Sequence, residues 1–167
     1  MTRGTIAAIG LGGNVGDVAA TLGEALRSLD SLPMTRLVQA SPRYRTPAWG
    51  NTAQADFINA AALIETGLDP RALLDGLLAI ECQFGRDRDA GVHWGPRTLD
   101  LDLLLYGDAL VDEPGLRVPH PHLHERAFVL LPLSRIGADL RVPGKGRVAD
   151  LLQHVDGSGC VALPLDA

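Results

Sequence analysis

Two aspartates placed two residues apart in a leucine-rich segment are the residues of this chain best suited to chemistry. Asp100 and Asp102 alternate with leucines, which are Leu99, Leu101, Leu103 and Leu105. In an extended strand this alternation turns the leucines toward a core and both aspartates out of the opposite face. Their Cα atoms would lie roughly 6.6 Å apart, given about 3.3 Å of rise per residue. Carboxylates at that separation repel each other, and a hard divalent cation that also binds phosphate oxygens relieves the repulsion.

The residues before the aspartates favour this interpretation over a solvated acidic strand end. Arg97 lies three residues before Asp100 and has a guanidinium group suited to phosphate. A lone aspartate at a strand end is commonly just solvated. The flanking residues, which are Trp94, Gly95, Pro96 and Arg97, are not typical of such an end. We therefore favour a cation-binding strand with Arg97 as a phosphate contact.

Three alternating histidines form a second candidate. His120, His122 and His124 have the spacing that a zinc site on a strand would use. Pro119 and Pro121 remove backbone donors and favour an extended path outside a sheet, and no HExxH motif is present. We favour a single phosphate-contacting histidine, His120, over a transition-metal site.

Three glycines near the N-terminus, Gly10, Gly12 and Gly13, match no complete nucleotide-binding motif. Gly10 and Gly12 would begin GxGxxG, but its third glycine falls on Val15, and the chain has no GK[ST] sequence. Two roles remain open for these glycines. They serve the strand-to-helix turn and a close backbone approach, or they lie beside a ligand.

The elements that must position these residues follow a β-α-β-β-α-β order. We expect strands over 5–11, 37–45 and 57–65, with the aspartate strand following a polar loop over 85–96. We expect one helix from Asp17 to Asp30 and another starting at Asp69 and Pro70, an N-cap and N1 pair. A short helix from Glu125 and a helical turn over 148–155 follow. The prediction is an α+β, ferredoxin-like βαββαβ sandwich with additional C-terminal strand and helix elements, in a single domain over 1–167.

The bulk composition excludes several classes of protein. The chain has 167 residues, of which 46% are hydrophobic and 21% charged, so wholesale disorder is excluded. The net charge of −5 argues against a nucleic-acid partner. Two cysteines without CxxC spacing provide no disulfide framework, and no apolar run approaches the ~20 residues that cross a bilayer. We expect a cytoplasmic monomer without a membrane partner.

Three segments of the chain together resemble a known family. They are FINAA at 57–61, the stretch that starts with Gly85-Arg86 and continues through WGPRTLDLDLLLYGD at 94–108, and VPHPHLHERAFVLLPL from Val118. These motifs are similar to those of the 6-hydroxymethyl-7,8-dihydropterin pyrophosphokinases of folate biosynthesis, and the similarity covers about residues 6–152. The resemblance implies a ferredoxin-like fold. It also implies transfer of the pyrophosphoryl group of ATP to the hydroxymethyl oxygen of the pterin, with release of AMP.

The resemblance implies a nucleotide half of the site. Asp100 and Asp102 match ligands of two Mg²⁺ ions that hold the triphosphate. The positions that match ATP contacts are Glu81, Arg86, Arg97 and His120. Catalysis would then depend on four residues, Arg86, Arg97, Asp100 and Asp102, acting by positioning and electrostatic stabilisation.

The resemblance also implies a pterin half. Phe57 and Phe128 match aromatic residues that stack on the two sides of the bicyclic ring. Asn59 would pair its amide with the pyrimidinone edge, and Trp94 would close over the site. The remaining contacts come from the loop that contains Thr46, Pro47, Ala48 and Trp49.

The alternative to an enzyme is a non-catalytic ferredoxin-like nucleotide-binding or regulatory module. One fold hosts many functions, so the element order alone does not exclude it. Formation of AMP from ATP in the presence of the pterin separates the two hypotheses.

Overall fold

The computed structural model describes residues 4–46, 56–84 and 98–163. In chain order the elements are β1 (Thr5–Gly13), α1 (Val18–Asp30), β2 (Thr35–Ala40), β3 (Tyr44–Thr46), β4 (Phe57–Thr66), α2 (Pro70–Gln83), β5 (Asp100–Tyr106), β6 (Val111–Glu113), β7 (Leu116–Val118), the 3₁₀ turn η1 (Leu123–Glu125), α3 (Ala127–Gly137), β8 (Arg141–Val142), β9 (Gly146–Arg147), α4 (Val148–Leu152) and β10 (Val161–Ala162).

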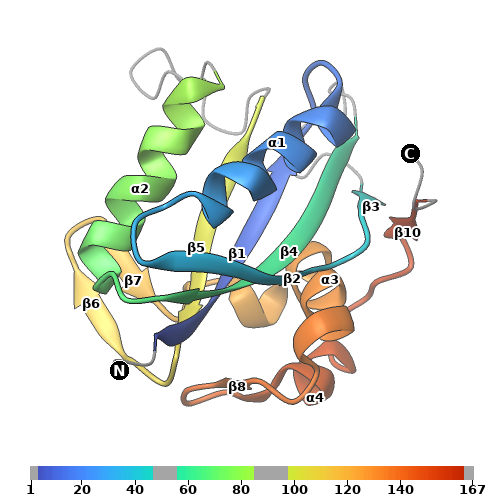
Figure 1. The fold of residues 1–167 in the computed structure, drawn as a ribbon. Helices are drawn as coiled ribbons and strands as arrows, with labels where there is room; N and C mark the ends of the chain where they lie inside the picture. The colour runs from blue at the N-terminus through green and yellow to red at the C-terminus, as the bar shows by residue number, and fades with distance from the viewer. Residues whose placement is uncertain (1–3, 47–55, 85–97, 164–167) are drawn as a thin grey trace.

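The main sheet is antiparallel and has the strand order β10-β3-β4-β1-β5, with β2 also paired to β4 (Figure 1). The long strands β1 and β4 form its centre, and β5 lies at one edge. Two small hairpins, β6-β7 and β8-β9, lie outside this sheet. Among the strands of residues 4–46, 56–84 and 98–163, the aspartate strand therefore pairs with β1 alone.

The predicted second strand over 37–45 is interrupted in the structure. β2 pairs with the C-terminal half of β4 and ends at Ala40, whereas β3 pairs with the N-terminal end of β4 and begins at Tyr44. Between them Pro42 has no amide hydrogen to donate to a ladder. The Ser41 hydroxyl accepts a hydrogen bond from the Ala61 amide, 2.9 Å away. A side chain thus replaces part of the backbone pairing at this point.

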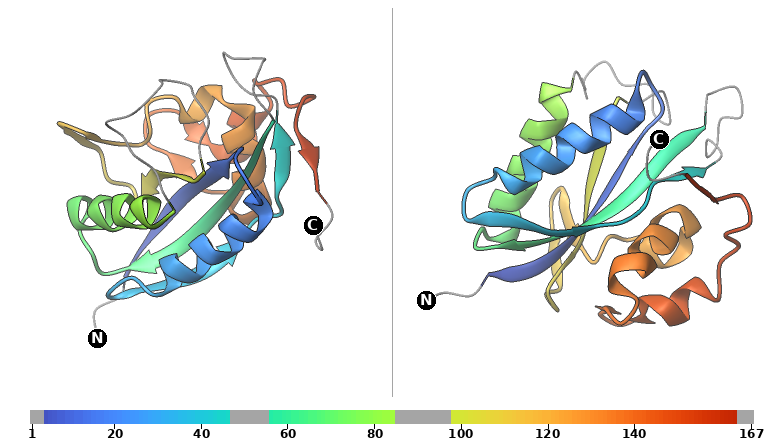
Figure 2. Two further views of the ribbon diagram at one scale, coloured as in Figure 1. Left: turned by 90° about the horizontal axis from the view of Figure 1, so that it is seen from above. Right: turned by 45° about the vertical axis from the view of Figure 1, so that its right-hand side comes forward.

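Helices cover both faces of the sheet. Figure 2 shows α1 and α2 on one face and α3 and α4 on the other. One buried cluster lies under α1 and α2, with members such as Ile9, Leu22 and Leu77. A second lies under α3 and α4 and includes Leu104 and Leu130. The candidate residues of β1, β4 and β5 are therefore held between two packed layers.

The two predicted helix starts are confirmed. The Asp17 carboxylate accepts a hydrogen bond from the Ala20 amide at 3.2 Å. The Asp69 carboxylate does the same for the Ala72 amide at 2.8 Å, with Pro70 in the first turn of α2. Each carboxylate satisfies an amide that the first helical turn leaves without a partner.

The alternation predicted for the aspartate strand holds as far as Leu103. Leu101 and Leu103 are buried under the α1–α2 face, and Asp100 and Asp102 are half-buried. The prediction for Leu105 is wrong, because it belongs with Leu104 to the cluster under α3 and α4. A register shift between β1 and β5 places an extra residue in β5 and reverses the alternation there. The bulge follows Leu103 and therefore does not change the orientation of the two aspartates before it.

Two further features concern the described residues. None of the helices there is long and apolar enough to cross a membrane. Cys82 and Cys160 are both free thiols.

Candidate active site

A cross-strand row brings two predicted site residues close together. Gly12 of β1 lies opposite Asn59 of β4 on one side and opposite Asp100 of β5 on the other; the three strands lie side by side in Figure 1. Directly opposite residues share a face of the sheet, and adjacent strands are about 4.8 Å apart, so Asn59 and Asp100 are separated by roughly 9.6 Å at the backbone. Asp102 occupies the next row, opposite Gly10. Both rows lie on the α3 side of the sheet, because Ala61, which is two residues after Asn59, is buried there.

The backbone between the two aspartates is held by Glu81 of α2. The Leu101 amide donates a hydrogen bond to a Glu81 carboxylate oxygen at 2.7 Å, and Glu81 is 1% exposed. This amide lies at the edge of the sheet, where no neighbouring strand of the described residues pairs with β5. Glu81 thus ties α2 to β5 at the centre of the Asp100-Leu101-Asp102 segment.

The backbone of His120 is hydrogen-bonded to β5 near the C-terminal end of that strand. Its amide donates to the Leu104 carbonyl at 3.0 Å, and its Nδ1 accepts from the His122 amide at 3.2 Å. An accepting Nδ1 places the hydrogen of the neutral ring on Nε2. Burial lowers the pKa of His120, and the negative charge of Asp102 opposes this effect. His120 is therefore a neutral ring with one N–H donor beside an aspartate.

The alternating histidines do not form a joint site. His122 and His124 both lie against Glu125, at 3.3 and 3.4 Å, and the ring centroids of His120 and His122 are 6.2 Å apart. Within residues 4–46, 56–84 and 98–163, no three His, Cys, Asp or Glu side chains form a group that could hold a metal ion. Asp100 and Asp102 offer oxygen ligands on one face, which fits a cation that takes its other ligands from phosphate and water.

A cavity of about 490 Å³ adjoins Asp102 and His120. Leucines from α2, β5 and β7 supply its apolar lining: Leu74, Leu78, Leu101, Leu103 and Leu116. Arg71 and Arg117 also line it, and both form surface ion pairs, with Glu113 at 3.1 Å and with Asp112 at 3.3 Å. Asp75 of α2 lines the cavity as well as Asp102. A partly apolar cavity with cationic groups at its margin suits a flat base that carries a polyphosphate.

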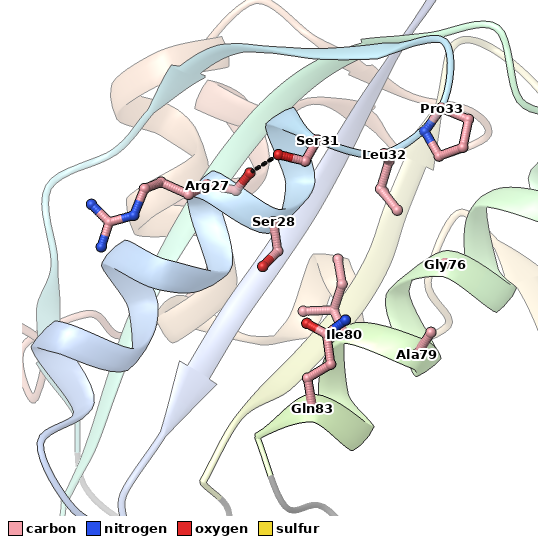
Figure 3. Close-up of a pocket in the computed structure, with 9 residues that line it drawn as sticks. All are labelled: Arg27, Ser28, Ser31, Leu32, Pro33, Gly76, Ala79, Ile80 and Gln83. Carbon is pink, nitrogen blue, oxygen red and sulfur yellow. Dashed lines mark hydrogen bonds between the residues drawn. The ribbon is translucent and has the colours of Figure 1, made fainter.

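A second hollow of about 350 Å³ lies between the C-terminal end of α1 and α2. Figure 3 shows Ser28, Leu32 and Ile80 around it, with the Arg27 side chain extending away from α2. The Ser31 hydroxyl donates to the Arg27 carbonyl at 3.0 Å and closes the end of the helix. Because its lining contains neither a carboxylate nor a histidine, we do not assign chemistry to it.

Three of the predicted pterin contacts, Thr46, Phe57 and Asn59, lie where β3 pairs with the start of β4. Phe57 starts β4 opposite Thr46, and the Asn59 amide nitrogen donates to the Thr46 hydroxyl at 2.7 Å. Phe128 lies in the first turn of α3, a helix that packs on β4. The Arg126 guanidinium lies 5.6 Å from the centroid of the Phe128 ring, a cation–π distance.

Six predicted site residues lie outside the described residues: Pro47, Ala48, Trp49, Arg86, Trp94 and Arg97. Sequence reasoning gave no role to Arg126 or to the Thr46 hydroxyl. Arg126 could have been found beside Phe128 in the HERAF motif. The Thr46 hydroxyl had no local signal, because its partner is thirteen residues away on another strand.

A carboxylate pair beside a partly apolar cavity with cationic groups at its margin suits a metal-dependent, nucleotide-using transferase. The comparisons with known proteins narrow this class to one family. The model of the 7,8-dihydro-6-hydroxymethylpterin-pyrophosphokinase (HPPK) family matches residues 8–138. The chain belongs to this family.

Individual relatives agree over nearly the full length. A 2-amino-4-hydroxy-6-hydroxymethyldihydropteridine pyrophosphokinase of Pseudomonas aeruginosa is 44% identical over 156 residues, which are 93% of this chain and 95% of that protein. The protein of the same name from Methylorubrum extorquens is 46% identical over 159 residues, 95% of this chain and 97% of its own length. The crystal structure of Plasmodium falciparum HPPK-DHPS with pteroate has a TM-score of 0.72 at 13% identity, covering 92% of this chain and 45% of that one. This last similarity shows a shared fold.

Proposed function

We propose that this chain transfers the pyrophosphoryl group of ATP to the hydroxymethyl oxygen of 6-hydroxymethyl-7,8-dihydropterin. A bond forms between that oxygen and the β-phosphorus, and the bond from the β-phosphorus to the oxygen bridging to the α-phosphorus breaks. AMP leaves with the electron pair, and the hydroxyl proton passes to water. The main support is the cross-strand row Asn59–Gly12–Asp100. In this row Asn59, which suits the pterin, is separated from Asp100, which suits the metal, by the single strand β1.

For the nucleotide half, we infer that ATP occupies the cavity beside Asp102 and His120. The leucine lining suits the base, and the Nε2–H of neutral His120 suits a phosphate oxygen. We propose that Arg86 and Arg97 bind the transferring phosphates, as the family resemblance implies. Such a reaction needs charge stabilisation and alignment more than covalent participation of the protein.

For the metal, we propose that Asp100 and Asp102 hold two Mg²⁺ ions together with the triphosphate. Bound magnesium would neutralise phosphate charge as it builds on the transferring group. The protein contributes the two carboxylates, their common face and the fixed backbone between them. The half-buried position of both aspartates supports this assignment.

We propose a positioning role for Glu81 in place of the direct ATP contact. The side chain is buried and its carboxylate binds the Leu101 amide. Glu81 would therefore affect ATP binding indirectly, by fixing the strand that carries the two aspartates. A shift of that amide would move both metal ligands together.

For the pterin half, we propose that Phe57 and Phe128 stack on the ring and that Asn59 binds its polar edge. Thr46 at the end of β3, which the sequence had placed in a loop, and Pro47, Ala48 and Trp49 after it would complete the edge contacts, and Trp94 would cover the ring. The support is that Thr46, Phe57 and Asn59 lie together at one end of β3 and β4.

The finer description of the fold is also part of the proposal. The strand order β2-β4-β1-β5, with antiparallel neighbours and α1 and α2 on one face, supports a ferredoxin-like sandwich. We further propose that the protein acts as a monomer, since both substrate sites are assigned within one chain. We also propose that it acts in the cytoplasm.

The experiment is incubation with ATP, Mg²⁺ and 6-hydroxymethyl-7,8-dihydropterin, with AMP quantified by chromatography. We expect AMP to accumulate only when the pterin is present. Binding of ATP without pterin-dependent AMP would favour the non-catalytic nucleotide-binding module.

A further inference from the structure

Gly12 occupies a position where a side chain would collide with Asn59. A Cβ atom at Gly12 would lie 2.3 Å from Asn59 Oδ1 and 3.4 Å from its Cγ. The first distance is far inside van der Waals contact. The next neighbour is the Ile58 carbonyl oxygen at 3.5 Å, an ordinary contact. A methyl group at Gly12 would therefore fit against the backbone of β4, but it would overlap the Asn59 carboxamide in its present position.

The Asn59 carboxamide is held from its other end as well. Its amide nitrogen donates to the hydroxyl of Thr46, which is 2% exposed. This bond anchors the amide nitrogen beside β3, and Oδ1 then lies on the side of Gly12. The second amide hydrogen and Oδ1 then form an adjacent donor and acceptor, the pattern that a pyrimidinone edge requires.

We propose that Gly12 is a positioning residue for pterin recognition, acting through Asn59. The missing side chain provides the space in which the Asn59 carboxamide lies, and the Thr46 hydroxyl anchors its amide nitrogen. This inference rests on the proposed function, because it takes Asn59 as the pterin contact. It extends that function by making the first strand part of the selection for the acceptor.

Gly10 is the matched control for Gly12. It lies two residues earlier on the same face of β1, and the three atoms nearest to a Cβ there belong to the Leu104 side chain, at 3.5 Å or more. Gly10→Ala therefore adds the same methyl group to the same strand without reaching Asn59. Any difference between the two variants reports on the Asn59 contact and excludes a general effect of alanine in β1.

The test compares wild type, Gly12→Ala, Gly10→Ala, Asn59→Ala and the double variant Gly12→Ala/Asn59→Ala. Titration calorimetry measures the Kd of the pterin in the presence of Mg²⁺ and α,β-methylene-ATP, and the Kd of that analogue alone. We expect Gly12→Ala to raise the pterin Kd about tenfold or more, the scale of a lost hydrogen bond in a buried site, with the analogue Kd unchanged within about twofold. Gly12→Ala should add nothing further in the Asn59→Ala background.

Two results would overturn the inference: a pterin Kd for Gly12→Ala equal to that of Gly10→Ala, or an equal penalty with and without the Asn59 side chain. If Gly12→Ala does not fold by circular dichroism, Thr46→Val and Thr46→Ser replace it. Thr46→Val lacks the hydroxyl and should bind the pterin more weakly than Thr46→Ser, and equal affinities would refute the anchoring of Asn59 by Thr46. A wild-type protein that neither binds the pterin nor forms AMP would refute the proposed function itself.

Discussion

The buried carboxylate of Glu81 accepts a hydrogen bond from the backbone amide of Leu101, at 2.7 Å. Leu101 separates the two aspartates that we assign to the metal, and its amide lies at the edge of the sheet, where no strand of the described residues pairs with β5. A helix residue thus does for this edge strand what a neighbouring strand would do. The arrangement makes the position of both aspartates depend on α2.

Replacing Glu81 tests this dependence. Glu81→Leu leaves a buried amide without its acceptor, which costs about 1–3 kcal/mol, and it should raise the KM for MgATP and lower kcat. Glu81→Gln keeps an acceptor of the same length and should retain much more activity. Steady-state kinetics of both variants, with thermal unfolding as the stability control, makes the comparison. Equal activities for the Gln and Leu variants would argue against a role through the hydrogen bond.

Replacing the aspartates tests the metal assignment. Asp100→Asn and Asp102→Asn keep the size of each side chain and remove its charge, so we expect each to lower single-turnover rates by about a hundredfold or more, since metal stabilisation is worth several kcal/mol. The fold should survive, because both side chains are only half-buried.

Chelation provides the second arm of the same test. EDTA should abolish turnover of the wild type and leave its circular dichroism spectrum intact, and added Mg²⁺ should restore the activity. Turnover that persists in excess EDTA would contradict the assignment of a metal to Asp100 and Asp102.

Acid sensitivity of folding should depend in part on His120. Burial lowers the pKa of this residue from 6.5. A histidine with a lowered folded pKa binds fewer protons in the folded state, so its contribution to stability is lost as the pH falls through 6.5 toward the folded value. The unfolding free energy of the wild type should therefore fall more steeply with acid than that of His120→Gln.

Urea titrations between pH 7.5 and pH 5, without nucleotide or metal, measure this difference. His154→Gln, a change at an exposed histidine after α4, is the control and should follow the wild type. Parallel curves for the wild type and His120→Gln would contradict the account.

The parts of the fold that local chemistry controls were predictable from the sequence. Asp17 and Asp69 start helices as their capping chemistry requires. The period-2 pattern correctly placed Leu101 and Leu103 in the core, opposite to the aspartates. These features depend on residues within a few positions of one another.

The parts that depend on pairing between distant segments were not predictable in the same way. The bulge that turns Leu105 to the other face arises from the register between β1 and β5. The break between β2 and β3 arises because the two segments pair with different halves of β4. The opposition of Gly12 to Asn59 is likewise a property of register.

Glu81 lies between these cases. It occupies the buried stripe of α2, four residues after Leu77 and next to Ile80, where a carboxylate needs a partner. The sequence predicted only a position beside ATP for Glu81, by resemblance, and neither its burial nor its bond to the amide between the two aspartates.

The identity of the transferred group is the most direct test of the central claim. The purified protein is given Mg²⁺, 6-hydroxymethyl-7,8-dihydropterin and ATP labelled at the γ-phosphorus, and the products are separated and identified by mass spectrometry. The account predicts unlabelled AMP and, in equal amount, a labelled pterin that carries two phosphorus atoms. ADP with a pterin monophosphate, or no pterin-dependent reaction, would contradict it.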